Sequence, residues 1–417
     1  MSAAVPAVDV LVVGAGPAGS AVAATVAAGG HRVVVVDRAE APGGKPCGEL
    51  LTPRALVALE RCGIAPDQLA GFHAVTHVRF TTQSASSAAR WPGHEEQPDH
   101  GLVAPRERLD SILVAHATAA GATVLGNHEA TAPIVERGFV RGARLVRNDG
   151  TTTEVRAAFT VVADGANSRF GRALGTYRHP TWPSALAHRA IYASSLHDAA
   201  EIELVVDLED RAGTPITGYG WMFPRGDGTA NVGVLMMSTS PSFLVVNPAR
   251  LLDRFVADNG VRWRLHGEPV HVPAGGRIPM GASVRPAAGP TYLVVGDAAG
   301  VANPFSGAGI EYAVETGVLA GGVLDEALRT GQAASLQRYP KLIDERYGTY
   351  FKVGRLVDRV LGRPALARRV ASSAAARPAF ARALIRVSAN SLRARHPGAA
   401  ELAYRVGAAI STVAPDA

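Results

Sequence analysis

The chain has 417 residues, of which 47% are hydrophobic and 19% are charged, and this length predicts two or three structural units rather than one small core. It contains no run of about eighteen uninterrupted apolar residues, so we do not expect a membrane-spanning helix. Its two cysteines form no C-x-x-C pair and its thirteen histidines show no metal-ligand spacing, so we expect a reduced, cytoplasmic protein without a metal site.

An apolar strand and a glycine-rich turn begin the chain. Residues 10–13 predict a buried strand, and Gly14-x-Gly16-x-x-Gly19 leads directly into an alanine-rich helix over residues 20–28. The first glycine of this pattern allows a tight turn, the second lets the backbone approach a pyrophosphate, and the third lets the helix pack closely on the strand. The free N–H groups at the helix N-terminus then face the phosphates.

A second apolar run, residues 32–36, ends in Asp37. A carboxylate at the end of the second strand of such a unit accepts hydrogen bonds from ribose hydroxyl groups. The strand, the turn, the helix and the acid together predict a dinucleotide-binding site. We include Ala18, in the helix entry, and Arg38, next to the acid, among its binding residues.

The following segment contains a loop, two helices and several strands. A loop rich in turn-forming residues spans 41–49, and a helix begins at Thr52-Pro53-Arg54. Residues 72–103 alternate and become more polar, which indicates strands that leave the first unit for a second one. We predict a helix from 105 to about 119, short strands at 123–125, 131–135, 142–146 and 152–156, and a buried strand at 159–162.

The second half of the chain returns to the first unit before it becomes helical. Residues 185–285 are typical of antiparallel strands, with one helix near 248–259. A buried strand at 291–295 ends in Gly-Asp, and a glycine-rich turn at 303–309 begins a long helix that ends near 328. From residue 333 the pattern is helical, with breaks at 362–364, 377–378 and 396–398.

Positive charge is concentrated in residues 331–417, which contain 15 Lys and Arg against 5 Asp and Glu. This balance indicates an anionic partner, which could be a membrane surface, a diphosphate or nucleic acid. The alternative is a helical region whose arginines form a solvated face. We do not expect nucleic acid, because no nucleic-acid-binding motif accompanies the charge.

Three segments far apart in the sequence belong to one pattern: the glycine motif with Asp37, Ala163-Asp164-Gly165-x-x-Ser168-x-x-Arg172, and Val295-Gly296-Asp297-Ala298-Ala299. In this order they resemble the flavoprotein superfamily that includes aromatic-ring hydroxylases, flavin halogenases and geranylgeranyl reductases. The resemblance covers about residues 8–330 and implies FAD as the cofactor. It implies that Asp297, after Gly296, holds the ribityl chain, and that Asp164 lies beside the pyrophosphate. It also implies that Arg106 contacts the ribityl or phosphate region.

The glycine-rich turn supports the same cofactor independently. Pro304, Gly307, Ala308 and Gly309 precede a long helix, and such a turn offers backbone donors without side chains in the way. Reduced flavin carries negative charge near N1 and the C2 carbonyl, which a helix N-terminus stabilises by roughly 1 kcal/mol. The alternative is an ordinary glycine-rich helix entry.

Two further segments resemble geranylgeranyl reductases and the related menaquinone reductases. Lys45-Pro46-Cys47-Gly48-Glu49 resembles their K-P-C-G loop, which assigns Lys45, Cys47 and Gly48 to the cofactor region. Gly218-Tyr219-Gly220-Trp221-Met222-Phe223-Pro224 resembles their Y-x-W-x-F-P motif. At strand periodicity Tyr219, Trp221 and Phe223 share one face. We predict that they and Pro224 bind an apolar isoprenoid alkene, and that the aromatic faces stabilise positive charge on a tertiary carbon.

The resemblance therefore implies an FAD-dependent reductase that saturates isoprenoid double bonds of a prenyl chain, carried by a menaquinone tail, geranylgeranyl diphosphate or a related prenyl lipid. Flavin N5 would deliver a hydride, and the candidate catalytic residues are Cys47, Tyr219 and Trp221. Ordered water is a further proton source, and Cys47 could instead be only a small residue in a tight loop. No second G-x-G-x-x-G unit is present, so NADPH would bind transiently or a ferredoxin-like partner would supply electrons.

Two other functions remain open. Gly48-Glu49-Leu50-Leu51-Thr52-Pro53 partly resembles the G-E-S-L-L-P loop of halogenases, so a monooxygenase or halogenase that modifies a secondary metabolite is one alternative. It is disfavoured because Tyr219 and Phe223 replace the Trp and Ile of the halogenase motif. A non-catalytic flavin-binding or prenyl-lipid-binding module is the other.

The expected fold is α/β, with a Rossmann-like FAD-binding domain (a parallel sheet plus a β-meander), an inserted antiparallel-sheet substrate domain and a C-terminal helical region. The FAD-binding domain is expected to comprise residues 1–75, 104–180 and 286–330, and the substrate domain residues 76–103 and 181–285. The basic helical region, 331–417, is expected to contact an anionic membrane peripherally, at the inner face of the cell membrane, or to hold a prenyl diphosphate.

Overall fold

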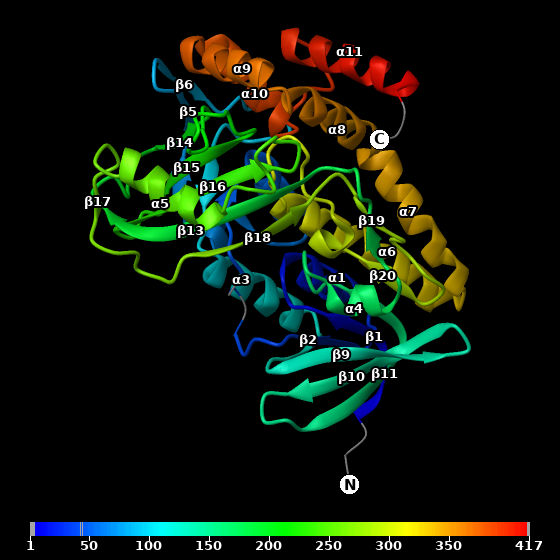
Figure 1. The fold of residues 1–417 in the computed structure, drawn as a ribbon. Helices are drawn as coiled ribbons and strands as arrows, with labels where there is room; N and C mark the ends of the chain where they lie inside the picture. The colour runs from blue at the N-terminus through cyan, green and yellow to red at the C-terminus, as the bar shows by residue number, and fades with distance from the viewer. Residues whose placement is uncertain (1–4, 42, 44, 415–417) are drawn as a thin grey trace.

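The computed structural model describes residues 5–41, 43 and 45–414, so the outermost residues of the predicted first and last domains lie outside it. A seven-stranded sheet forms the core of the first unit, in the order β8-β2-β1-β11-β10-β9, with β20 also paired to β11 (Figure 1). These strands are β1 (Val5–Val13), β2 (Val33–Val36), β8 (Thr123–Leu125), β9 (His128–Glu136), β10 (Phe139–Arg147), β11 (Thr152–Val162) and β20 (Tyr292–Val294).

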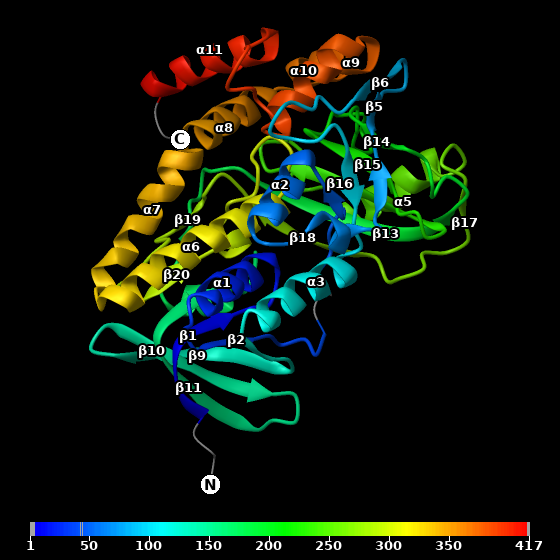
Figure 2. The ribbon, with the colours of Figure 1, turned by 180° about the vertical axis from the view of Figure 1, so that it is seen from behind.

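The long strand β11 takes part in both parallel and antiparallel pairing. Its second half runs parallel to β1 and β20, whereas its first half pairs antiparallel with β10 in a β-meander. The parallel strands are buried on both faces, as their continuous apolar runs predict. Figure 2 shows the helices α1 (Pro17–Ala28), α3 (Arg106–Ala119) and α6 (Ile310–Thr330) in front of the parallel strands.

Glycines at the first turn have the geometry that their motif requires. Gly14 has a φ of +108°, and a Cβ there would lie 2.3 Å from the carbonyl oxygen of Ala163. A Cβ on Gly19 would lie 1.9 Å from the carbonyl oxygen of Gly14. Helix α1 can therefore approach the strand closely only because both positions lack a side chain.

The second unit is an eight-stranded sheet in the order β17-β13-β16-β15-β14-β5-β6, with β18 also paired to β13. All neighbours are antiparallel except β14 and β5. Its strands are β5 (His77–Thr81), β6 (Ser86–Arg90), β13 (Ser184–Ser194), β14 (Glu201–Val205), β15 (Gly218–Pro224), β16 (Thr229–Met237), β17 (Leu265–His266) and β18 (Ala274–Pro279). Helix α5 (Pro248–Asn259) packs on one face through Leu252 and Phe255.

Short elements connect the two units. A three-stranded sheet contains β3 (Leu50–Leu51), β7 (Gly101–Val103) and β4 (His73–Val75), and a two-stranded sheet contains β12 (Tyr177–Arg178) and β19 (Val284–Arg285). The remaining helices of this part are α2 (Pro53–Arg61) and the short α4 (Arg169–Ala173).

The C-terminal region consists of α7 (Arg338–Ile343), α8 (Thr349–Leu361), α9 (Pro364–Ala376), α10 (Pro378–Ser388) and α11 (Ala399–Val413). Proline is the first residue of both α9 and α10, where its missing N–H is not needed, which confirms the predicted breaks. Ala374 and Ile385 of these helices pack into the same apolar cluster as Val78 and Ala89 of the second sheet. The C-terminal helices therefore cover the face of this sheet that α5 leaves free.

The structure confirms the predicted fold class and corrects some element limits. The strands predicted separately at 152–156 and 159–162 are one strand, β11. Helix α4 was not predicted, because five residues are too few for a helical period, although the Ser168 side chain caps it by accepting a bond from the Gly171 N–H. No helix in the described part of the chain is long and apolar enough to cross a membrane.

Candidate active site

A cavity of about 940 Å³ begins at the carboxyl ends of β1, β2 and β11 and continues between the second sheet and the C-terminal helices. Most of the predicted site residues line it, namely Gly14, Gly16, Ala18, Asp37, Arg38, Lys45, Cys47, Gly48, Arg106, Asp164, Asp297, Pro304, Gly307, Ala308, Gly309, Tyr219, Trp221 and Phe223. Gly19, Gly296 and Pro224 do not line it. The first two make close backbone packing instead, since a Cβ on Gly296 would lie 2.7 Å from the Ala18 Cβ.

The glycine turn forms one end of the cavity. A Cβ on Gly16 would meet no atom within 4 Å, so the backbone there faces open space at the N-terminus of α1. The Asp37 carboxylate closes the turn by accepting bonds from the N–H groups of Ala15 at 2.8 Å and Ala39 at 2.9 Å. His128 also lines this end, and the sequence patterns did not indicate it.

Asp164 presents an unsatisfied acceptor at this end. Its Oδ2 accepts a bond from the Phe170 N–H at 3.0 Å, whereas its Oδ1 is buried and has no partner among the described residues. Burial raises the pKa of Asp164 above its ordinary value. A buried acceptor of this kind requires a donor, and a ligand hydroxyl group would supply one.

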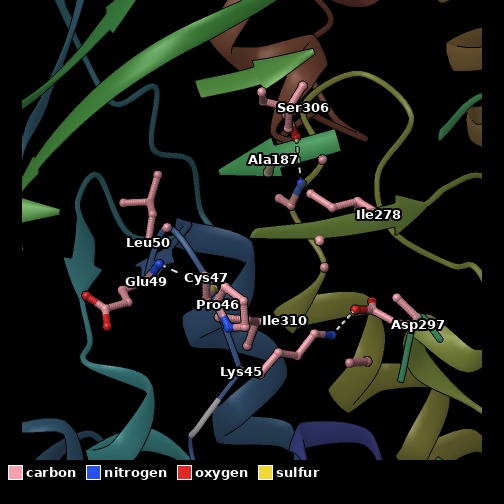
Figure 3. A pocket seen from close by; sticks show the side chains of 18 of the residues that line it. Lys45, Pro46, Cys47, Glu49, Leu50, Ala187, Ile278, Asp297, Ser306 and Ile310 are labelled. Carbon is pink, nitrogen blue, oxygen red and sulfur yellow. Dashed lines mark hydrogen bonds and ion pairs between the residues drawn. The ribbon is translucent and has the colours of Figure 1, made fainter. Parts of the chain in front are cut away.

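Lys45 and Asp297 form an ion pair across the cavity, as Figure 3 shows. Lys45 comes from the loop before β3, and Asp297 from the turn after β20. Asp297 is therefore held at the cavity wall by the buried parallel sheet. The Lys45 side chain is 44% exposed, so ligand hydroxyl groups can replace its ammonium group at the Asp297 carboxylate.

The turn before α6 approaches from the same side. Asn303 stabilises it, because its Oδ1 accepts a bond from the Phe305 N–H at 2.9 Å. Gly307 has a φ of +76° and leaves no room for a Cβ, which would lie 2.7 Å from Leu235. In the first turn of α6, burial raises the pKa of Glu311 to about 7, and its carboxylate accepts a bond from Thr52 at 3.4 Å.

The aromatic residues of β15 form one wall. Ring centroids are 6.2 Å apart for Tyr219 and Trp221 and 5.9 Å apart for Trp221 and Phe223, as strand alternation predicts. The Tyr219 hydroxyl donates to the carbonyl oxygen of Ser306 at 2.6 Å, and burial raises its pKa well above the ordinary value. Its proton is therefore directed at the backbone. The opposite face of β15 is flat because a Cβ on Gly220 would lie 2.1 Å from the Phe255 ring.

Asn231 of β16 connects this wall to the K-P-C-G loop, and no sequence pattern indicated it. Its Oδ1 accepts a bond from Trp221 Nε1 at 3.0 Å. Its Nδ2 donates to the Cys47 carbonyl oxygen at 2.8 Å and to Glu49 Oε2 at 3.1 Å. Glu49 in turn forms an ion pair with Arg225 at 3.0 Å. The position of Cys47 relative to the aromatic wall is thus determined by a buried hydrogen-bond network.

Arg106 lies behind the Cys47 loop. Its guanidinium forms a bidentate pair with Asp110 at 2.9 and 2.6 Å and also interacts with the Cys47 side chain. Burial works against the charge, but Asp110 and Cys47 together raise the pKa of Arg106. The Cys47 Sγ accepts a bond from the Glu49 N–H at 3.3 Å (Figure 3).

Comparisons with known proteins agree with this geometry. A family model described as FAD binding domain matches residues 7–200. The chain is 36% identical over 359 residues to a menaquinone reductase of Mycobacterium tuberculosis, covering 85% of this chain and 84% of that protein. A digeranylgeranylglycerophospholipid reductase of Methanosphaerula palustris is 33% identical, with 78% of each chain covered. This chain belongs to the geranylgeranyl reductase family.

Solved structures share the fold of this chain. A geranylgeranyl bacteriochlorophyll reductase-like protein of Thermoplasma acidophilum has a TM-score of 0.76 at 25% identity, with 92% of this chain and 96% of that chain covered. A flavin-dependent brominase has a TM-score of 0.69 at 18% identity and is similar in fold only. This member of the geranylgeranyl reductase family is an FAD-dependent oxidoreductase.

The residues at the first end of the cavity fit FAD. Gly16 opens onto free space beside the N-terminus of α1, and Asp164 Oδ1 lacks a donor. Asp297 faces a cation that a ligand can displace. In the described part of the chain no group of three His, Cys, Asp or Glu side chains is placed to hold a metal ion.

Proposed function

We propose that this chain saturates isoprenoid carbon–carbon double bonds of a prenyl chain. The support for this proposal is one continuous cavity that leads from the glycine turn, past the aromatic wall, into an apolar extension. The extension is lined by Val78, Leu204, Val370, Ala374 and Ile385, which come from the second sheet and the C-terminal helices. A long hydrocarbon chain matches this lining, whereas a small polar metabolite would leave it exposed to water.

The residues of the first end would hold the cofactor. Gly14 and Gly16 would bind the pyrophosphate, Asp37 the ribose and Asp297 the ribityl chain. The N-terminus of α6 would stabilise negative charge on the ring system. Reduced FAD, when bound, supplies a hydride equivalent.

The remaining residues would handle positive charge and the proton. An isolated alkene forms no enolate, so hydride addition must be closely coupled to protonation of the other carbon. The faces of Trp221 and Phe223 would stabilise cationic character at the substituted carbon and exclude water. The candidate proton sources are Cys47, beside the Arg106 guanidinium, and ordered water. The structure speaks against Tyr219, which the sequence also suggested, because its hydroxyl proton is donated to the Ser306 carbonyl oxygen. We propose either NADPH or a ferredoxin-like protein as the electron donor.

An anaerobic turnover assay tests this function. The FAD-loaded protein is reduced with NADPH or dithionite and mixed with a menaquinone, geranylgeranyl diphosphate or a geranylgeranylated glycerophospholipid. We expect mass spectrometry to detect the gain of two hydrogen atoms per double bond. Oxygen-dependent NADPH consumption with modification of an aromatic compound would favour the monooxygenase or halogenase alternative. Flavin that never turns over with any donor would favour a binding module.

We further propose that the chain is cytoplasmic and docks peripherally on the inner face of the cell membrane through its C-terminal helices. Leu402, Val406, Ile410 and Val413 of α11 share one helix face and are 55%, 61%, 57% and 86% exposed. The buried residues of α11 are Ala400, Glu401 and Ser411. Exposed aliphatic side chains on a helix in a basic region are typical of interfacial membrane binding. Helices α9, α10 and α11 lie at one end of the molecule (Figure 1).

A vesicle flotation assay tests this docking. Replacing Val406 and Ile410 by Asp should abolish flotation with vesicles that contain acidic phospholipid, because it removes apolar area and adds repelled charge. In the matched control, Asp replaces Val135 and Val261, two exposed valines that lie outside the C-terminal helices. Equal flotation of the α11 variant and the wild type would refute the docking.

A further inference from the structure

A second hollow, of about 610 Å³, adjoins the substrate cavity. The segment between β6 and β7 and two arginines of α10 line it. Trp91 lines both the hollow and the cavity. Two consecutive residues of α10 line different spaces. Ile385 lines the cavity, and Arg386 lines the hollow. The two spaces are therefore adjacent, and they meet at Trp91 and α10.

Positive charge exceeds negative charge in this hollow. Arg90, Arg382 and Arg386 line it, against a single carboxylate, Asp99, which pairs with Arg90 at 2.6 Å. The side chain of Arg386 is only 11% exposed. Its Nη1 donates to the carbonyl oxygen of Ser391 at 3.1 Å.

No carboxylate fully neutralises the two arginines of α10. Arg386 Nε lies 3.6 Å from Glu401, but Glu401 accepts bonds from the Nε and Nη2 of Arg393 at 3.0 and 3.2 Å. Arg382 is exposed and forms no ion pair within the described ranges. Burial, followed by the neighbouring cations Arg393 and Arg382, lowers the pKa of Arg386, so a bound anion would relieve an unfavourable charge.

Two buried donors in the same lining also lack partners. Trp91 is 5% exposed, and its indole Nε1 has no acceptor among the residues described. His94 Nδ1 accepts a bond from the Glu96 N–H at 3.3 Å, which places the proton of the neutral ring on Nε2. That Nε2 is buried and equally unpartnered. Since indole and guanidinium groups are donors only, the residues around the hollow carry more donors than acceptors, and this balance favours a ligand rich in acceptors.

We infer that this hollow binds the phosphate of the prenyl substrate, while the hydrocarbon chain occupies the adjoining cavity beyond Trp91. Arginine forks match phosphate oxygens in geometry and charge. The phosphate could belong to a free prenyl diphosphate or to a glycerophospholipid headgroup, and both offer the same oxygens. This inference rests on the proposed prenyl reduction. It favours a phosphorylated substrate over menaquinone, which carries no phosphate.

The test compares phosphorylated and unphosphorylated substrates with the FAD-loaded full chain. The variant Arg382→Gln removes an exposed cation from the lining without touching a buried bond. The matched control is Arg61→Gln on α2, an exposed arginine that lines neither space. We expect Arg382→Gln to raise KM at least tenfold for geranylgeranyl diphosphate, for a geranylgeranylated glycerophospholipid, or for both. The KM for geranylgeraniol and every kcat should stay unchanged, and the control should match the wild type.

The pattern of outcomes separates the two proposals. A KM increase confined to the diphosphate or to the phospholipid supports the inference and identifies the source of the phosphate. Equal KM changes for geranylgeraniol, or no change for either phosphorylated substrate, would overturn it while prenyl reduction stands. If the wild type reduces none of these substrates, prenyl reduction fails, and calorimetry with inorganic pyrophosphate still tests the hollow. Heat of binding that Arg382→Gln weakens supports the anion site, and absence of binding to the wild type refutes it.

Discussion

At the scale of single residues, the site depends on carboxylates and amides whose partners come from distant parts of the chain. Asp297 faces Lys45 across the cavity, and Asn231 ties Trp221 to the Cys47 loop. In each pair, the two partners are positioned by different elements of the chain. Removing one of them therefore disturbs a contact between distant segments of the chain rather than a local turn.

Replacing Asp297 by Ala should lower the occupancy of FAD. A hydrogen bond to a charged group contributes roughly 1.5–3 kcal/mol, which corresponds to about a tenfold to hundredfold weaker binding. The measurement is the ratio of flavin to protein absorbance after gel filtration, with Asp258→Ala, on the exposed side of α5, as the control. Flavin retention equal to that of the wild type would show that Asp297 does not bind the cofactor.

At the scale of elements, the two faces of β15 have different neighbours, the cavity on one side and helix α5 on the other. Tyr219, Trp221 and Phe223 face the cavity, whereas Gly220 lies against Phe255 of α5. The glycine lets the helix lie close to the sheet, and the sheet in turn holds the aromatic rings in place. Packing on the back of the strand therefore supports the wall on its front.

Gly220→Ala should destabilise the fold by roughly 1–3 kcal/mol, because the new methyl group would force the buried Phe255 ring to move. Chemical denaturation followed by circular dichroism measures the free energy of unfolding. The control, Gly276→Ala, lies in β18 of the same sheet, where a Cβ would meet no atom within 4 Å. If both variants unfold at the same denaturant concentration, the Phe255 ring of α5 does not pack tightly against Gly220 of β15.

At the scale of the whole molecule, the C-terminal helices complete the cavity. They close the apolar extension, and they place one buried acid in it. Asp358 of α8 lines the cavity, and its Oδ1 accepts a bond from Thr239 at 3.0 Å. Its Oδ2 is buried without a partner among the described residues. Burial raises the pKa of Asp358 to about 7.

This acid predicts a pH-dependent stability. Because its folded pKa lies above the unfolded value, its stabilising contribution is present below about pH 4 and is lost as the pH rises toward 7. Between pH 5 and pH 8 the wild type should lose on the order of 2 kcal/mol more stability than Asp358→Asn. Glu311 titrates in the same range in both proteins, so its effect cancels in the comparison. Parallel stability curves measured by denaturation across this range would contradict the prediction.

Local patterns allowed much of this protein to be predicted from its sequence. The glycine turn, Asp37 and the apolar runs that become β1, β2 and β20 each depend on neighbours within a few residues. The alternation of Tyr219, Trp221 and Phe223 is likewise local, because a strand places every second side chain on one face. The cofactor and the fold class followed from these segments and from their resemblance to flavoproteins.

Only the tertiary structure could reveal what depends on contacts between distant segments. Asn231 lies in an apolar strand without any motif, and its importance comes from bonds to Trp221 and Cys47, which belong to other elements. The basic C-terminal region was expected at an anionic surface, but its helices also line the cavity. Arg382 and Arg386 meet Arg90 only because α10 packs on β6. Charge and periodicity are properties of a segment, whereas a cavity or a binding hollow forms only where several segments meet, and chain folding decides which ones do.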